Sequence, residues 1–248
     1  MKILGIDIGG SAVKGAPVDT RTGRLVAPRH RIATDKKLSP KEMAATIKRL
    51  AAHFDWAGPI GVGFPGVVHG PRILTSANLH KDFCDCDVVR LFGKATGCPV
   101  ALINDADAAG MAEIRFGAGR DITGTVLLLT LGTGVGSALF CNGRLFPNSE
   151  LGHLPIRGKS AERFVSSAAK DRRDLDYKEW GKELRDYIRV LEKILWPERI
   201  IIGGGVSKNH AKFFKYIKPR AQLVPAEFFN EAGIVGAAMW AAEQQRKR

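Results

Sequence analysis

The sequence predicts an α/β protein with two similar lobes, because the same order of elements occurs twice along the chain. In each half, a buried strand, a glycine turn and a β-hairpin precede the helices, so residues 8–13 align with residues 131–136. The hairpin turns also align, with Gly23-Arg24-Leu25 opposite Gly143-Arg144-Leu145. Internal repeats of this kind identify the architecture of a chain. A duplicated βββα unit implies two lobes with a cleft between them, and chance similarity is the alternative.

The composition is that of a soluble globular protein, with 45% hydrophobic and 25% charged residues. The 248 residues suffice for one large domain or for two lobes with a hydrophobic core. No apolar run approaches the roughly 20 residues of a bilayer span. The N-terminus leads directly into a strand and lacks the apolar core of a signal peptide. We therefore expect a cytoplasmic protein with no membrane partner.

The chain is strongly basic, with 38 Lys and Arg residues against 25 Asp and Glu residues and a net charge of +13. A basic surface binds a polyanion or is simply solvated. The charge alone therefore leaves nucleic acid, an anionic membrane and polyphosphate open as partners.

The four cysteines do not form a disulfide framework. Cys84 and Cys86 have the spacing of a metal-binding pair, but a zinc site needs about four ligands. No second close pair of Cys or His accompanies them. Two ordinary thiols are the favoured interpretation.

The first half is predicted to alternate short buried strands with helices. Ser39 to Glu42 form a capping box with proline at the first helical position, so a helix begins at residue 40. Gly97 and Gly117 end two later helices. The expected strands are residues 3–8, 13–18, 24–31, 60–63 and 100–103, and the expected helices are residues 40–53, 88–95 and 106–116.

The second half repeats this order. Asn142-Gly143 suits a type I′ turn within a hairpin over residues 135–146, which follows a strand over residues 125–130. A helix over residues 178–195 carries an apolar stripe at helical spacing that is most simply part of the core. The other expected elements are a strand over residues 199–202 and helices over residues 160–169, 207–217 and 233–244.

Three glycine turns each follow a predicted strand: Gly9-Gly10, Gly132-Thr133-Gly134 and Gly203-Gly204-Gly205. None has the spacing of a P-loop or of a dinucleotide-binding motif, and a single turn would mean little because turns need glycine. Three of them at strand ends favour a phosphate clamp made of backbone N–H groups. Asp7 stands beside the first turn, where a carboxylate orients Mg²⁺ directly or through water. A turn-capping aspartate is the alternative.

Asn104 and Asp105 end one strand and begin a helix. Asp105 is either a helix cap or a general base that takes the proton of an attacking hydroxyl. Glu150, His153 and Glu162 follow the second glycine turn, and carboxylates and an imidazole can bind hydroxyl groups. We therefore expect a phosphate near the glycine turn and a sugar near Glu150 and His153.

Taken together, these motifs resemble the ROK family of sugar kinases. They occur in order over nearly the whole chain: Asp7-Ile8-Gly9-Gly10, Asn104-Asp105, Leu131 to Gly136, Glu150 to His153, and Gly203 to Val206. Further segments resemble the polyphosphate glucokinases within that family, namely Pro147 to Leu154, Trp180, Gly205 to Lys208, residues 224–226 and residues 230–238.

The resemblance implies an actin-like, ribonuclease H-like fold that is usually homodimeric, with lobes at residues 1–104 plus 232–248 and residues 105–231. It implies that Asp105 is the base that deprotonates the sugar 6-hydroxyl. The implied sugar ligands are Asn78, Asn104, Asp105, Glu150, His153 and Glu162. The implied phosphate-binding residues are Asp7, Gly9, Gly10, Ser11, Lys14, Thr133 and Gly134.

The sequence departs from the family in one place. Most ROK kinases carry a C-x-C-G-x-x-G-C zinc motif shortly after the Gly-His pair, whereas residues 156–162 contain no cysteine. We therefore expect no zinc site and a loop that is held by its own packing. Polyphosphate glucokinases also lack this motif. No helix-turn-helix precedes Met1, so we do not expect a nucleic-acid partner.

Lysines after the third glycine turn indicate the phosphoryl donor. On a helix over residues 207–217, Lys208, Lys212 and Lys215 would form one basic stripe that begins where Gly204 and Gly205 turn toward the cleft. An inorganic phosphate chain has no base to stack, so repeated cations bind it best. A solvated helix face is the alternative.

These observations predict a kinase that transfers a phosphoryl group from polyphosphate to glucose, with Mg²⁺ as cofactor. They leave ATP open as a second donor and mannose open as a second acceptor. A strictly ATP-dependent kinase for glucose, mannose or another hexose is one alternative. A non-catalytic regulator that binds a sugar or a polyanion is the other.

Overall fold

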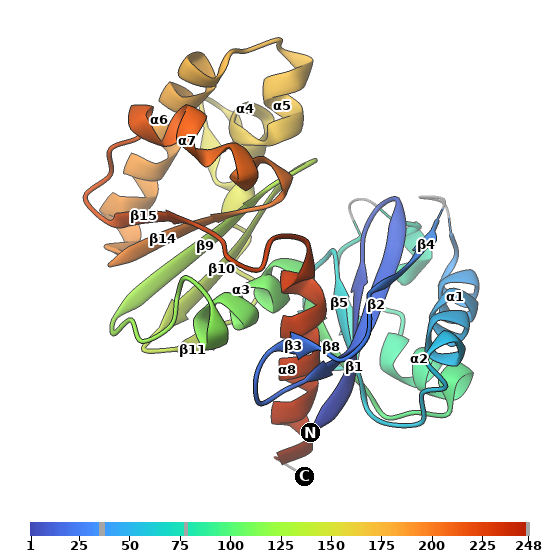
Figure 1. The fold of residues 1–248 in the computed structure, drawn as a ribbon. Coiled ribbons are helices and arrows are strands. Elements are labelled where there is room, and N and C mark those ends of the chain that lie inside the picture. The colour runs from blue at the N-terminus through green and yellow to red at the C-terminus, as the bar shows by residue number, and fades with distance from the viewer. Residues whose placement is uncertain (35–37, 77–78, 247–248) are drawn as a thin grey trace. The chain divides into compact units, whose positions relative to one another are not determined.

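The computed structural model describes residues 1–34, 38–76 and 79–246, and the chain forms two compact units (Figure 1). Unit 1 contains Met1–Ala112 and Glu231–Arg248, and unit 2 contains Glu113–Asn230. The chain passes from one unit to the other inside helix α3 (Asp105–Phe116), whereas the sequence interpretation divides it directly before this helix.

Unit 1 is built on a mixed six-stranded sheet in the order β3-β2-β1-β5-β8, with β4 also paired to β2. β1 is antiparallel to β2 and parallel to β5, which is parallel to β8. The parallel strands therefore end at the same edge of the sheet, where Asp7 and Asn104 lie. The strands are β1 (Lys2–Ile8), β2 (Ala12–Asp19), β3 (Arg24–Leu25), β4 (His30–Ala33), β5 (Ile60–Phe64) and β8 (Val100–Asn104).

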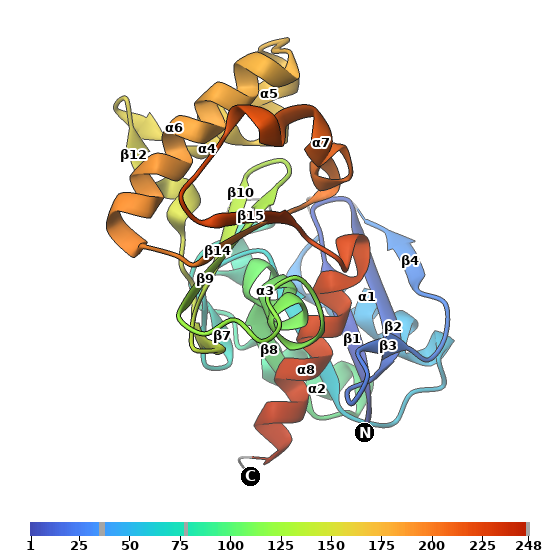
Figure 2. The ribbon, with the colours of Figure 1, turned by 60° about the vertical axis from the view of Figure 1, so that its left-hand side comes forward.

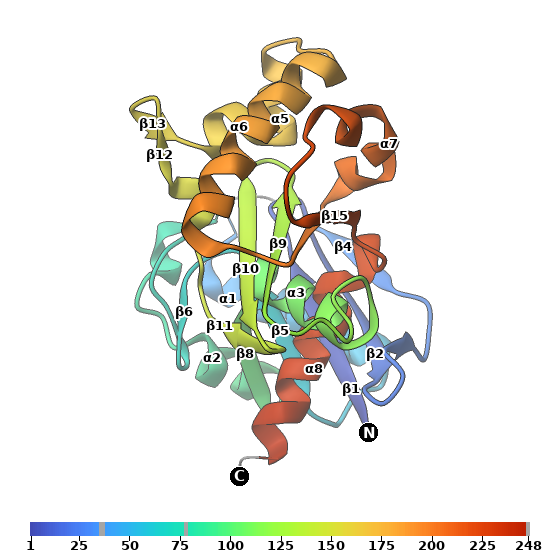
Figure 3. The same cartoon turned by 90° about the vertical axis from the view of Figure 1, so that its left-hand side faces the viewer.

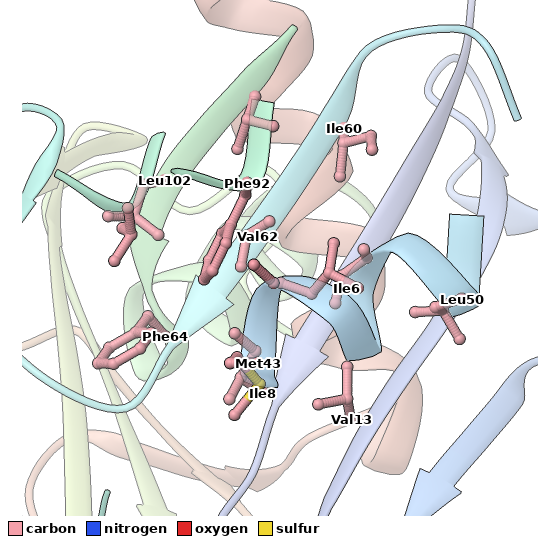
Figure 4. Close-up of a cluster of buried hydrophobic side chains, with 14 of the residues drawn as sticks. Ile6, Ile8, Val13, Met43, Leu50, Ile60, Val62, Phe64, Phe92 and Leu102 are labelled. Carbon is pink, nitrogen blue, oxygen red and sulfur yellow. The ribbon is translucent and has the colours of Figure 1, made fainter. Parts of the chain in front are cut away.

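Helices cover both faces of this sheet (Figures 1 and 2). On one face, Ile6 and Ile8 pack with Met43 of α1 (Pro40–His53) and Phe92 of α2 (Val88–Thr96), as Figure 4 shows. On the other face, α8 (Ala232–Arg246) contacts the strand backbones. A Cβ atom at Gly61 would lie 1.9 Å from the Ala237 carbonyl oxygen, so this close contact requires glycine. The last helix thus packs on the sheet of the N-terminal unit, as the resemblance implies.

Unit 2 contains a five-stranded sheet in the order β11-β10-β9-β14-β15. The first three strands form an antiparallel meander, and β14 and β15 run parallel to β9. This order and these directions match β3-β2-β1-β5-β8 of unit 1, so the two sheets bear out the internal repeat. The strands are β9 (Thr125–Leu131), β10 (Val135–Cys141), β11 (Arg144–Phe146), β14 (Arg199–Gly203) and β15 (Gln222–Pro225).

The helices of unit 2 pack beside the sheet, and α6 (Tyr177–Leu195) lies along β9 and β10 (Figure 3). Trp180, Leu184 and Tyr187 on α6 are buried with Leu127 and Leu129 of β9, so the apolar stripe on this helix is core as expected. The other helices are α4 (Glu162–Val165), α5 (Ser167–Arg172) and α7 (His210–Phe213).

The structure differs from the sequence prediction at several elements. The expected helix over residues 160–169 is broken at Ser166, whose hydroxyl accepts the Ala169 N–H at 3.1 Å and caps α5. The expected helix over residues 207–217 is a chain of short turns, η3 (Gly205–Asn209), α7 and η4 (Phe214–Tyr216). The expected strand over residues 24–31 is split around Pro28, which lacks an N–H group. Strand β15 was not predicted.

The remaining elements are short. They are the hairpins β6 (Val68–His69) with β7 (Arg72–Ile73) and β12 (Pro155–Ile156) with β13 (Lys159–Ser160), and the turns η1 (Lys81–Phe83), η2 (Leu151–His153) and η5 (Phe229–Glu231). Among the described helices, none combines the length and the apolar composition of a membrane span.

Candidate functional site

Asp7 lies at the carboxyl end of β1, beside the first glycine turn. Asp7 Oδ2 is 3.6 Å from Nζ of Lys14, its partner on β2. The start of α8 lies against the carboxylate, because a Cβ atom at Gly233 would lie 3.0 Å from Asp7 Cγ. Burial raises the pKa of Asp7, although Lys14 and Arg29 oppose the shift. A further cation at this carboxylate would stabilise its charged form.

The first glycine turn leaves backbone groups accessible. The Gly9 N–H donates to the Ala12 carbonyl at 2.9 Å and closes the turn. Gly10 is half-buried and Ser11 is exposed. The Gly10 backbone and the Ser11 hydroxyl therefore suit contact with a phosphate.

Asn104, and not Asp105, caps helix α3. The Asn104 Oδ1 atom accepts the Asp107 N–H at 3.0 Å, and its Nδ2 donates to the Gly66 carbonyl at 3.1 Å. The Asp105 Oδ1 atom accepts the N–H of its neighbour Ala106 at 2.8 Å, and Asp105 is half-buried. Asp105 is therefore not the cap of α3, which was the alternative interpretation of this residue. Asn78, another expected sugar ligand, lies outside the described residues.

The second glycine turn joins β9 to β10 in unit 2. The Gly132 N–H donates to the Gly134 carbonyl at 3.0 Å, and Thr133 is exposed. The Glu162 carboxylate lies over this turn: its Oε2 accepts the Val135 N–H at 3.4 Å, and a Cβ atom at Gly134 would lie 2.5 Å from the same oxygen. An expected phosphate turn and an expected sugar ligand are therefore neighbours within one unit.

Glu150, His153 and Glu162 form one cluster beside this turn. His153 Nε2 lies 3.7 Å from Glu150 Oε2, and His153 Nδ1 lies 4.0 Å from Glu162 Oε1. The Glu150, His153 and Glu162 side chains are 36%, 56% and 33% exposed, so their polar atoms remain accessible. An imidazole between two carboxylates offers donors and acceptors together, which suits a polyhydroxylated ligand.

Two buried hydroxyl groups hold the segment that carries Glu150 and His153. The Ser137 hydroxyl on β10 donates to the Ser149 carbonyl and accepts the Leu151 N–H at 3.0 Å. The Tyr187 hydroxyl on α6 donates to the Leu151 carbonyl at 3.1 Å, and burial raises the pKa of Tyr187 so that it stays a donor. Sequence reasoning missed both residues, because Tyr187 belongs to an apolar helix stripe and Ser137 to a strand.

The hairpin β12–β13 lies between His153 and Glu162 in the chain and is attached to α6 by an arginine clamp. At its turn, Arg157 Nη1 is 3.6 Å from Glu183 Oε1. Arg173 makes hydrogen bonds of 2.5 and 2.8 Å with the same carboxylate. The Arg157 and Arg173 guanidinium groups lie 5.5 and 6.0 Å from the centre of the Phe164 ring. These four side chains, which we call the arginine clamp, provide the packing expected for a loop without cysteines.

The third glycine turn passes beside the second. Gly204 has φ of 81°, and a Cβ atom there would lie 2.4 Å from the Leu131 carbonyl oxygen, directly before Gly132. The Ser207 hydroxyl donates to the Gly204 carbonyl at 2.8 Å and closes the turn. Gly205 is exposed, and beyond its chain neighbours no atom of the described residues lies within 4 Å of a Cβ atom built on it.

The predicted stripe of Lys208, Lys212 and Lys215 does not form as expected, because the continuous helix that it needs is absent from the described segment. Lys212 Nζ lies 5.4 Å from the centre of the Tyr177 ring on α6. Lys215 Nζ lies 5.1 Å from the ring of its neighbour Tyr216, and Lys208 is exposed. Lys212 and Lys215 are therefore directed at different aromatic partners.

Glu113 is a buried carboxylate that sequence reasoning also missed. It accepts backbone N–H groups of Ala118 at 2.9 Å, Glu227 at 2.9 Å and Phe228 at 2.8 Å. Burial raises the pKa of Glu113, against the lowering effect of these bonds. Its contacts join the segment after α3 to the segment after β15, so its role in unit 2 is structural.

Within the described ranges, no group of three or more His, Cys, Asp or Glu side chains is arranged to hold a metal ion. Cys84 is exposed and Cys86 is half-buried. Burial raises the pKa of the Cys86 thiol, which disfavours the thiolate that metals bind.

Known proteins resemble this chain in sequence and in fold. The model of the ROK family matches residues 3–169. Polyphosphate glucokinase from Mycobacterium tuberculosis is 43% identical over 237 residues, which cover 95% of this chain and 89% of that protein. The crystal structure of inorganic polyphosphate/ATP-glucomannokinase from Arthrobacter sp. strain KM is 41% identical, with a TM-score of 0.94 over 98% of this chain and 99% of that chain.

A ROK family glucokinase from Streptomyces griseus, solved with glucose and AMPPNP, is 22% identical, with a TM-score of 0.83 over 98% of this chain and 100% of that chain. At this identity the likeness concerns the fold. Together the similarities confirm the fold class predicted from the sequence.

Proposed function

Because the chain belongs to the ROK family, we propose that it transfers a phosphoryl group from inorganic polyphosphate to the 6-hydroxyl of glucose. The observation that carries this proposal is the 43% identity to a polyphosphate glucokinase over 95% of the chain. The glycine turns and the cluster around His153 provide the two kinds of binding group that this reaction needs. ATP is proposed as a second donor, since a relative at 41% identity is described as a polyphosphate/ATP-glucomannokinase.

We assign the acceptor to the hydroxyl-binding residues. The cluster of Glu150, His153 and Glu162 supplies hydrogen-bond partners that can discriminate among hydroxyl positions. Asp105 is the proposed general base that orients the 6-hydroxyl and accepts its proton as the new bond to phosphorus forms. This role is supported by its position at a strand end and by the capping of α3 by Asn104 instead. Asn78 and Asn104 are further proposed sugar ligands.

We assign the donor to the glycine turns. Backbone N–H groups in such turns stabilise the charge on phosphoryl oxygens in the transition state. The proposed contacts of either donor at these turns are Gly9, Gly10, Ser11, Lys14, Thr133, Gly134, Gly204 and Gly205. Lys208 and Lys212 follow the third turn and are proposed contacts of the polyphosphate chain alone.

Asp7 would hold Mg²⁺, directly or through water. The site fits a cation, because the Asp7 carboxylate is an oxygen ligand of the kind that Mg²⁺ prefers. Burial disfavours the charged form of this carboxylate, and Lys14 offsets that effect only in part. When bound, Mg²⁺ supplies positive charge that neutralises the phosphate chain. Lys14 contributes a second positive charge at the same strand end.

We further propose mannose as a second acceptor, a homodimer and a cytoplasmic location. The name of the Arthrobacter relative supports the first of these proposals. The resemblance to the family supports the dimer, and light scattering after size exclusion would measure its mass.

A coupled assay of the purified chain with each donor and each sugar tests the proposed reaction. We expect glucose 6-phosphate with polyphosphate and glucose, and we expect Asp105→Asn to lose at least about 100-fold in kcat, as is typical when a general base is removed, while glucose still binds. Transfer from ATP but not from polyphosphate would support the strictly ATP-dependent alternative. No transfer with any donor would support the non-catalytic alternative, and near-normal turnover of Asp105→Asn would refute the role of Asp105.

A further inference from the structure

We infer that Lys170, Tyr177 and Lys212 form a subsite for the part of a polyphosphate chain that extends beyond the glycine turns. The three residues lie on α5, α6 and α7 of unit 2 but meet at one ring. Lys170 Nζ lies 4.9 Å and Lys212 Nζ lies 5.4 Å from the centre of the Tyr177 ring. This two-lysine subsite rests on the proposed use of polyphosphate.

The two lysines follow the two glycine turns of unit 2. The Ala168 N–H donates to the Gly132 carbonyl at 3.1 Å, so α5 is attached to the second turn two residues before Lys170. Lys212 follows the third turn by way of η3, and Gly204 in that turn packs against Leu131. Because the two turns are adjacent, a linear anion that leaves them along unit 2 can reach both ammonium groups.

The ring that both lysines approach is held in place. The Tyr177 ring is stacked on Phe213, with centroids 6.1 Å apart and planes at 12°, and it meets the edge of Trp180 at 6.4 Å. Trp180 is fully buried, and its indole N–H donates to the Val165 carbonyl at 3.2 Å. The Lys170 side chain is only 17% exposed, which is low for a lysine. The ring and Lys170 are therefore preorganised, which lowers the entropic cost of binding, whereas Lys212 is exposed.

The charge of this subsite is poorly neutralised. The carboxylate near Lys170 belongs to Asp171, at 3.3 Å, and that side chain is 71% exposed, so the pair contributes little. No ion pair of Lys212 is found among the described residues. Two cations at one ring also repel each other, and an anion between or across them removes that repulsion.

This arrangement favours inorganic polyphosphate over a nucleotide. Repeated negative charges along a flexible chain match separate ammonium groups, as they do for other polyanions. A nucleotide ends its short phosphate chain with a nucleoside, which gains nothing from additional ammonium groups. The subsite should therefore act on the affinity for long chains alone.

The test is the double variant Lys170→Gln/Lys212→Gln of the full chain. Equilibrium binding of long-chain polyphosphate is measured without sugar at several salt concentrations, and KM is measured for long-chain polyphosphate, ATP and glucose. We expect the affinity for the long chain to fall about tenfold or more. The slope of log affinity against log salt should become shallower by about 1.4, at roughly 0.7 for each of the two lost contacts. KM for ATP and glucose should stay within about twofold of the wild-type values.

The control is Lys182→Gln/Lys193→Gln, which removes the same charge from exposed positions on α6. An equal loss of affinity in this control, an equal rise in KM for ATP, or an unchanged affinity for polyphosphate would overturn the inference. Preferential binding of single-stranded nucleic acid at these lysines would also overturn it. The wild-type chain could also bind polyphosphate through these lysines and yet fail to phosphorylate glucose. That result would support the subsite and refute the proposed function.

Discussion

Glu183→Gln tests whether the arginine clamp positions the sugar ligands. Glu183 is shared by Arg157 at the turn of the β12–β13 hairpin and by Arg173. This hairpin is the connection between His153 and Glu162. Without the carboxylate, two guanidinium groups would remain over Phe164 with no negative charge between them. We expect the hairpin to move away from α6 and the cluster around His153 to lose its geometry.

The magnitude follows from the contacts that are lost. A hydrogen bond to a charged group contributes about 1.5–3 kcal/mol. The Arg157 and Arg173 side chains are 57% and 34% exposed, so water weakens the interaction. We expect the free energy of unfolding to fall by about 1–2 kcal/mol. If a similar free energy is lost in sugar binding, KM for glucose should rise by about 5–30-fold.

The assay separates positioning from stability. KM and kcat are measured for glucose and for each donor well below the melting temperature, and unfolding is followed in urea. Asp186→Asn is the matched control, because it removes a carboxylate from the same helix whose partner among the described residues is Arg185. An unchanged KM for glucose in a destabilised Glu183→Gln variant, or a similar rise in KM for the donor, would refute the positioning role.

Two further predictions concern unit 1 and the pH dependence of unit 2. Gly61→Ala should lower the free energy of unfolding by about 3 kcal/mol or more, because the new methyl group meets the α8 backbone 1.9 Å away. Gly93→Ala on α2, where the nearest atom is 3.4 Å away, should be neutral or stabilising in the same urea titration. Burial raises the pKa of Glu113, so its contribution to stability is complete below its ordinary pKa of 4.5 and is lost as the pH rises through the folded-state pKa. The stability of the wild type relative to Glu113→Gln should therefore decrease from acidic to neutral pH, and a difference that does not vary with pH would contradict this reasoning.

Local patterns in the sequence determined most of the elements and the chemistry of the candidate site. Strands that end in glycine turns can be predicted from the sequence, because the burial pattern of a strand and the glycine of a turn both depend on neighbouring residues. The helix that Ser39 caps was predicted for the same reason, since its capping box lies within four residues. The internal repeat then predicted two sheets of the same order, which the structure contains. The motifs around Asp7, Asp105 and Glu150 could also be recognised from short segments of the sequence.

Only the tertiary structure decided which side chains meet. Glu113 is buried because residues about a hundred positions later supply two of its N–H partners. The segment after Gly205 has helical periodicity, yet packing on α6 divides it into short turns and directs Lys212 to Tyr177. Lys170 carried no signal at all, because its partner ring lies on another helix. Hydrogen bonds and ion pairs between distant segments depend on the chain's path in space, and local sequence does not encode that path.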